Sequence, residues 1–303
     1  MSNGIGVTRH ATSASRTIFV ATAFYTGSLA MSIVSRVFVL ASKFRSRGSA
    51  TTRGICTNHS DQQQRLQRRS KNVVTVVLTG GPCAGKSSSL QSMKETLTKE
   101  GYQILTVPEV PTILMENGCK FPGIDGPRAR LLRYETLLIE MQLHMENTFI
   151  DMATLAPTAS TTTGTADATA GPNHHHHHAS VIICDRGACD VAAYMPTDLW
   201  HETLASVGTT QQALLDRYDI VCHLVTAADG AEAFYTTANN LTRTETPAEA
   251  VALCRRTQAC WAAHTTCAVF PNEGVSFADK VGQVSAFVVE QCNRIVDSEP
   301  REQ

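Results

Sequence analysis

Residues 80–87, GGPCAGKS, fit the pattern G-x-x-x-x-G-K-[ST] in the context that this pattern requires. An apolar, β-branched stretch at 73–79 precedes the run and predicts a buried strand. The amphipathic stretch after it predicts a helix over 88–100 that ends at Gly101. Glycines let the backbone curl so that successive N–H groups face one point, and the helix adds the positive end of its dipole. The strand, loop and helix together predict a cradle for the phosphates of a nucleotide.

The loop itself supplies the candidate nucleotide ligands. These are Gly80, Gly81, Pro82, Cys83, Ala84, Gly85, Lys86, Ser87 and Ser88. We expect Lys86 to bring a mobile positive charge to the phosphates and Ser87 to be a ligand of Mg²⁺. Cys83 has a second interpretation, because its oxidation could block the nucleotide, but a small residue filling a turn is the simpler reading.

Strand-like and helical segments alternate along the rest of the chain. Strands are predicted at 102–107, 181–185, 220–225 and 267–270, and helices at 128–152, 197–206, 211–217, 247–266 and 279–293. Alternation of this kind is typical of βαβ units, which build parallel sheets. The predicted fold is therefore an α/β P-loop NTPase of the kinase type, with a parallel sheet of about five strands, helices on both faces and a lid.

Three charged residues fall just where predicted strands end, which is where open parallel sheets bind ligands. Glu109 could act as general base toward a substrate hydroxyl or hydrogen-bond it, or be a solvated cap. Asp185 could hold Mg²⁺ as a Walker-B-type acid, or be a helix N-cap. Arg186 could contact the acceptor or the transferred phosphoryl group, or form an ion pair with a nearby acid.

Two further candidates lie away from the strand ends. Arg243 belongs to the polar connection 236–246 and could close over the phosphates as a lid arginine, excluding water and adding positive charge. Gln142 lies midway along the helix predicted over 128–152. It could read the base or amide edge of a substrate, or simply be exposed.

The charge distribution divides the chain. Residues 1–70 carry ten Lys or Arg and a single acid, whereas 71–303 carry 16 basic and 26 acidic residues. We expect 1–70 to be a targeting or disordered extension, 71–296 to be the P-loop domain and 297–303 to be a tail. The first sixty residues are free of acids and rich in Ser, Thr, Ala and Arg, as in a mitochondrial transit peptide, which favours a mitochondrial over a cytoplasmic location.

Partners other than the nucleotide are only weakly indicated. The uncharged stretch 17–35 is just long enough to cross a bilayer, and it is the one place where membrane contact is expected. Basic character alone does not indicate nucleic acid, and no nucleic-acid partner is expected.

Residues 154–179 are of low complexity and predict a disordered insert within the domain. Five consecutive histidines at 174–178 could bind Zn²⁺ or Ni²⁺, but no Cys, Asp or Glu ligand stands beside them to complete a site. Homopolymer drift is the simpler explanation of this tract.

Seven features, separated along the chain, carry a family resemblance. They are VVLTGGPCAGKSS, VPEVPTILMENGCKFPG, the spacing of Gln142 and Glu146, VIICDRGACDVAAYMP, RYDIVCHLVTAADGAEAFYT, NNLTRTE, and the pair Trp261 and His264. Together they resemble the NadR/TRPL-translocation-defect family, a group of AAA-type P-loop ATPase and kinase-like domains. The resemblance covers 73–295 and differs where Pro271 precedes Asn272, because the family tends to have an acid there.

The resemblance implies a function as well as site residues. Residues 80–87 take the nucleotide role, Asp185 with Arg186 the acid–arginine role, and Arg243 the lid role. Bacterial members include a nicotinamide riboside kinase domain, which implies Mg²⁺-dependent phosphoryl transfer from ATP, or from GTP, to a small hydroxyl-bearing acceptor such as a nucleoside. An insect relative is a GTP- and phosphoinositide-binding trafficking protein, which implies the alternative of a slowly hydrolysing switch with a protein partner. The chain has no N/T-K-x-D guanine motif, so ATP is preferred.

Overall fold

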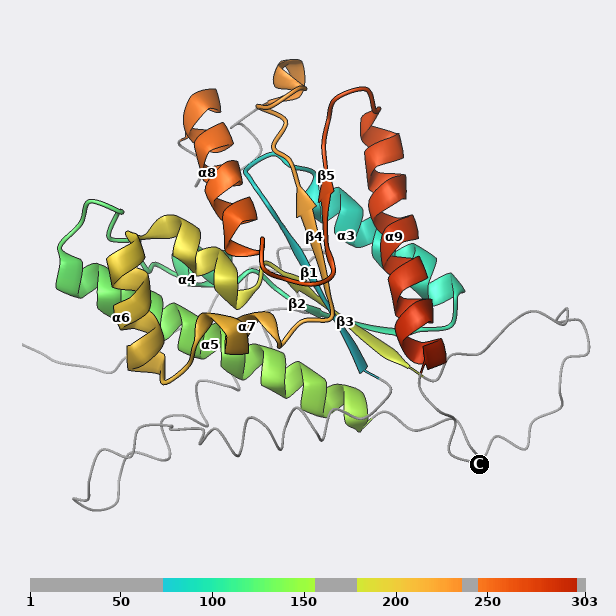
Figure 1. The fold of residues 1–303 in the computed structure, drawn as a ribbon, viewed down its shortest axis with the longest axis horizontal. Coiled ribbons are helices and arrows are strands. Elements are labelled where there is room, and N and C mark those ends of the chain that lie inside the picture. The colour runs from blue at the N-terminus through green and yellow to red at the C-terminus, as the bar shows by residue number, and fades with distance from the viewer. Residues whose placement is uncertain (1–72, 156–178, 236–244, 299–303) are drawn as a thin grey trace, which may run out of the picture. The chain divides into compact units, whose positions relative to one another are not determined.

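The computed structural model describes residues 73–155, 179–235 and 245–298. The predicted extension 1–70, residues 156–178 of the predicted insert, Arg243 and the end of the predicted tail lie outside this part of the chain. Figure 1 shows the described residues as a sheet with helices packed against it.

Five parallel strands form the sheet. They are β1 (Val73–Gly80), β2 (Gln103–Val107), β3 (Ser180–Asp185), β4 (Ile220–Leu224) and β5 (Cys267–Phe270), in the order β2-β3-β1-β4-β5. β1 is the central strand, and all its residues are buried. A strand covered on both faces needs a continuous apolar sequence, which VVTVVLTG supplies. The α/β P-loop fold predicted from the sequence is thus confirmed.

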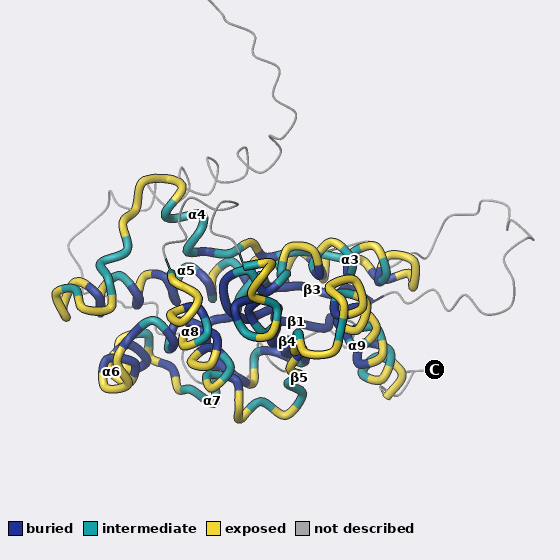
Figure 2. The backbone as a smooth tube through the Cα atoms, turned by 90° about the horizontal axis from the view of Figure 1, so that it is seen from above, coloured by how far each residue is buried: buried dark blue, intermediate teal, exposed yellow. Residues whose placement is uncertain are grey.

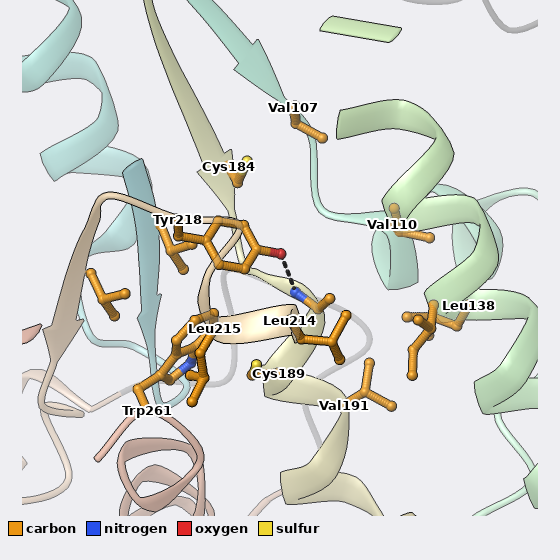
Figure 3. Close-up of a cluster of buried hydrophobic side chains, with 14 of the residues drawn as sticks. Val107, Val110, Leu138, Cys184, Cys189, Val191, Leu214, Leu215, Tyr218 and Trp261 are labelled. Carbon is orange, nitrogen blue, oxygen red and sulfur yellow. Dashed lines mark hydrogen bonds between the residues drawn. The ribbon is translucent and has the colours of Figure 1, made fainter. Parts of the chain in front are cut away.

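The two faces of the sheet have separate cores, because successive side chains of β1 point to opposite faces. On one face Val74, Val76 and Leu78 pack with residues of α3 (Lys86–Lys99) and α9 (Phe277–Ser298). On the other face Val73 and Val77 share a core with several helical elements (Figure 3). These are the short α4 (Val110–Glu116), α5 (Arg128–Thr154), η1 (Ala188–Tyr194), α6 (Thr197–Val207) and α7 (Gln211–Leu215).

Two helix predictions need correction. The helix predicted over 247–266 ends early: α8 spans Pro247–Cys260, and Trp261 leaves helical geometry with φ −107° and ψ 0°. The indole of Trp261 is fully buried, so a tertiary contact sets this helix end. α4 was not predicted, because its seven residues are too few to show a helical period.

Burial follows the layers of the fold. Figure 2 shows the strands buried between helices whose outer sides are exposed. The capping box formed by Thr246 and Glu249 fixes where α8 begins. Within the described ranges no helix has the length and apolar character needed to span a bilayer.

Candidate functional site

The phosphate loop connects β1 to α3 and is held by the segment that follows β4. Thr226 donates its hydroxyl hydrogen to the carbonyl of Pro82 at 2.5 Å, and the amide of Ala227 donates to the carbonyl of Cys83 at 3.2 Å. A Cβ atom at Gly81 would lie 2.8 Å from Cβ of Cys254 on α8. The loop is therefore packed so closely that only glycine fits at this position.

Lys86 is the first residue of α3, and its ammonium group lies within the loop. Its Nζ donates to the carbonyls of Gly81 at 3.2 Å and Gly80 at 3.4 Å. Burial lowers the pKa of Lys86 to about 8, and nearby Arg186 adds to the effect, while three carboxylates oppose it. These carboxylates belong to Glu109, Asp185 and Asp190. The charged residues predicted at the strand ends are thus brought together around Lys86.

Glu109 and Arg186 form an ion pair, with 2.5 Å between Oε1 and Nε. The second carboxylate oxygen of Glu109 accepts a hydrogen bond from Thr112 at 2.8 Å. Burial by itself would raise the pKa of Glu109, but Arg186, Lys86 and these hydrogen bonds outweigh it and lower the pKa to about 2. The ion pair that was one of two interpretations of Arg186 is present. Glu109 stands at the N-cap position of α4, but its side chain makes no capping hydrogen bond.

Asp185 ends β3 beside this pair. Gly187, and not Asp185, is the N-cap of η1, so the interpretation of Asp185 as a cap is wrong. Its Oδ1 is fully buried and has no hydrogen-bond partner in the described residues. Burial raises the pKa of Asp185, and the charge of Lys86 opposes this. An unpartnered carboxylate oxygen fits Mg²⁺, which prefers oxygen ligands, and the exposed hydroxyl of Ser87 at the start of α3 would be a second one.

Asp190 is a member of the site that the sequence analysis missed. It lies in η1, is buried, and accepts hydrogen bonds at Oδ1 from the Thr79 hydroxyl and the Trp261 indole, both at 2.6 Å. Its Oδ2 is 3.8 Å from Nη1 of Arg186. Burial raises the pKa of Asp190, although Arg186 opposes this. Asp190 therefore joins Arg186 to the central strand and to Trp261.

A second buried network supports Arg186 from α5. Gln142 is buried, and its amide donates to Glu146 at 2.9 Å and to the backbone carbonyl of Arg186 at 3.3 Å. Glu146 also accepts from Arg217 and from the Tyr218 hydroxyl. The Tyr218 hydroxyl in turn accepts from a backbone amide of η1, as Figure 3 shows. Gln142 is thus not exposed, and its amide group serves this internal network.

Asn272 anchors the opposite side of the site. Its amide donates to the carbonyls of Thr226 and Asp229, each at 2.7 Å, and its oxygen accepts from Lys280 at 2.7 Å. Asn272, with Pro271 before it, thus ties the end of β5 to the segment that holds the phosphate loop. The predicted lid arginine, Arg243, lies outside the described residues.

A protein-family model described as "AAA domain" matches residues 75–275. The chain belongs to the AAA domain family. The matched range of this AAA domain runs from β1 past β5 and contains the phosphate loop with Lys86 and the clustered residues Glu109, Asp185, Arg186 and Asp190. Family and fold together make the chain a P-loop nucleotide-binding domain. No curated protein matches the sequence.

Proposed function

We propose that this AAA domain is a small-molecule kinase of the NadR type, which binds Mg²⁺ with ATP, or with GTP, and phosphorylates a hydroxyl-bearing acceptor. The observation that carries the proposal is the cluster around Lys86. Four charged side chains from separate strand ends and from η1 converge on one lysine of the phosphate loop. A domain that only held a nucleotide with Mg²⁺ would need the loop and Asp185, but not the pair of Glu109 and Arg186 beside them.

The proposed reaction needs little covalent work from the protein. The acceptor oxygen forms a bond to the γ-phosphorus while the bond from that phosphorus to the β–γ bridging oxygen breaks. The electron pair of the broken bond leaves with the nucleoside diphosphate, and the acceptor proton passes to a carboxylate. Lys86 and Arg186 would stabilise the charge on the transferred group. Ser87 and Asp185 would hold Mg²⁺, which would neutralise negative charge on the phosphate oxygens.

Glu109 is the carboxylate proposed to receive the acceptor proton. Its pKa of about 2 makes it a weak base. A weak base suffices when the transition state is loose, because the attacking oxygen then loses its proton late. The pairing with Arg186 also keeps Glu109 ionised and in place at neutral pH.

A nucleotide-dependent switch is the second candidate, favoured by the same ion pair. Both oxygens of Glu109 already accept hydrogen bonds, one from Arg186 and one from Thr112. A carboxylate whose two oxygens are occupied is poorly placed to receive a proton, so slow nucleotide hydrolysis would be expected. Such a domain would signal through a protein partner that recognises its nucleotide state, as the resembled trafficking protein would imply.

The two candidates separate in a transfer assay with the full chain. ATP and GTP are each supplied with Mg²⁺ and a panel of nucleosides and nicotinamide riboside. In the kinase, Glu109→Gln lowers acceptor phosphorylation by about two orders of magnitude and leaves nucleotide affinity unchanged. The matched control is Glu116→Gln, at the exposed end of α4. Nucleotide hydrolysis that is equal with and without every acceptor would exclude the kinase and favour the switch.

A further inference from the structure

Glu135 is a buried carboxylate that the site described above does not use. It lies on α5, is 2% exposed, and forms no hydrogen bond or ion pair within the described part of the chain. Burial raises its pKa to about 8. Buried acids are ordinarily paired, because an isolated charge in an apolar surrounding is costly. An unpaired one in a binding domain is a candidate ligand contact.

The carboxylate oxygens of Glu135 are nearly, but not completely, enclosed. In the described residues, the fully buried polar side-chain atoms without a hydrogen-bond partner are on Ser89, Asp185, Asp190, Thr209 and His223. The oxygens of Glu135 are not among them, although they also have no partner. Each of them therefore keeps a small accessible area, within the 2% of the residue that is exposed.

The contacts of α5 place Glu135 near the site. Gln142 donates to the Arg186 carbonyl just after β3 ends, and Glu146 accepts from Arg217 just before β4 begins. Glu135 precedes Gln142 by seven residues, which is two turns on the same face, or about 10 Å along the axis. Along α5, Glu146 therefore lies near the start of β4 and Gln142 near the carboxyl end of β3, and Glu135 lies beyond that end.

The neighbourhood of Glu135 is apolar and continuous with the start of α4. Leu138, one turn further along α5, belongs to the same buried core as Val110, and Val110 directly follows Glu109. Phe121 and Tyr134 pack edge to face with ring centroids 5.7 Å apart, and both border the same core. A carboxyl group without an internal partner in such a surrounding is suited to orient a small molecule through the hydrogen-bond donors of that molecule.

We propose that Glu135 is a specificity residue for the acceptor, accepting hydrogen bonds from hydroxyl groups at the end of the acceptor remote from the one that reacts. This proposal rests on the proposed kinase function. It narrows the acceptor to molecules long enough to reach from the Lys86 cluster toward Glu135 and carrying more than one hydroxyl, of which ribosides are the class tested.

The test is calorimetric titration of the full chain, first with Mg²⁺ and a non-hydrolysable ATP analogue and then with adenosine, uridine and nicotinamide riboside. At least one riboside binds the wild type. Glu135→Met removes both acceptor oxygens and weakens that binding at least tenfold, whereas Glu135→Gln weakens it less, because it keeps a carbonyl oxygen where the protonated acid has one. Glu140→Gln, on the exposed face of the same helix, changes nothing. All variants bind the analogue equally, which also shows that they are folded.

Two results overturn the proposal: equal riboside affinity in the wild type and Glu135→Met, or no binding of any of the three ribosides to the wild type. Either result leaves binding of the ATP analogue intact, and therefore contradicts only the role of Glu135 in acceptor binding. A chain that fails to bind the analogue with Mg²⁺ contradicts the proposed function itself.

Discussion

Replacing Glu135 by glutamine should change how the stability of the domain depends on pH. The folded-state pKa of Glu135 is about 8, above its ordinary value of 4.5. Between these values the folded protein keeps the proton while the unfolded chain has lost it. The stabilising contribution of the protonated acid is therefore complete below pH 4.5, declines as pH rises, and is lost above pH 8. Glutamine has no such titration.

The size of the effect follows from the shift in pKa. Each unit corresponds to about 1.36 kcal/mol, so the free energy of unfolding of Glu135→Gln minus that of the wild type should rise by up to about 5 kcal/mol between pH 4.5 and 8. This is an upper limit, because the carboxylate oxygens keep some contact with solvent. We expect at least about 2 kcal/mol, since the side chain is otherwise covered.

The assay is urea unfolding of the full chain at intervals from pH 4.5 to 9, with Glu140→Gln as the exposed control on the same helix. The difference between Glu135→Gln and the wild type should climb steadily and level off above pH 8, while the control stays parallel to the wild type. A difference that does not vary with pH would refute the reasoning, because it would mean that Glu135 titrates alike in both states.

Two further substitutions test the packing of the site. Gly81→Ala places a Cβ 2.8 Å from Cβ of Cys254, so it should weaken ATP binding at least tenfold and cost about 1–3 kcal/mol in urea unfolding. Gly282→Ala, which meets no atom within 4 Å, should leave binding unchanged, and equal behaviour of the two would contradict the packing argument. Arg217→Met leaves the buried carboxylate of Glu146 without its ion pair, so unfolding should become easier by about 3–5 kcal/mol. A loss below about 1 kcal/mol would show that this pair does not support the core.

The sequence predicted the sheet well because the signal for each strand is local. The apolar run of β1 and the short β5, Cys267–Phe270, both lie where their composition indicated. The phosphate loop was equally readable, because its glycines and Lys86 stand in a fixed order between a strand and a helix. The convergence of Glu109 on the loop followed from one rule, that ligands gather at the carboxyl ends of parallel strands.

The rest of the site depends on contacts between residues far apart in the chain. Asp190 stands in a short 3-10 helix with no motif of its own, and its partners Thr79 and Trp261 are 111 and 71 residues away. The same distant contact explains why α8 ends before Trp261. Glu135 looked like any charged residue of an amphipathic helix, and only its burial in the folded domain distinguishes it.

The central claim is that a nucleoside triphosphate binds with Mg²⁺ where Lys86 meets the carboxyl edge of the sheet. Calorimetric titration of the full chain with ATP, with and without Mg²⁺, tests it most directly, with Lys86→Ala beside the control Lys99→Ala at the exposed end of α3. The account predicts Mg²⁺-dependent binding to the wild type and the control, and at least a hundredfold loss in Lys86→Ala. Equal affinity in all three proteins, or no binding of ATP or GTP to the wild type, would contradict it.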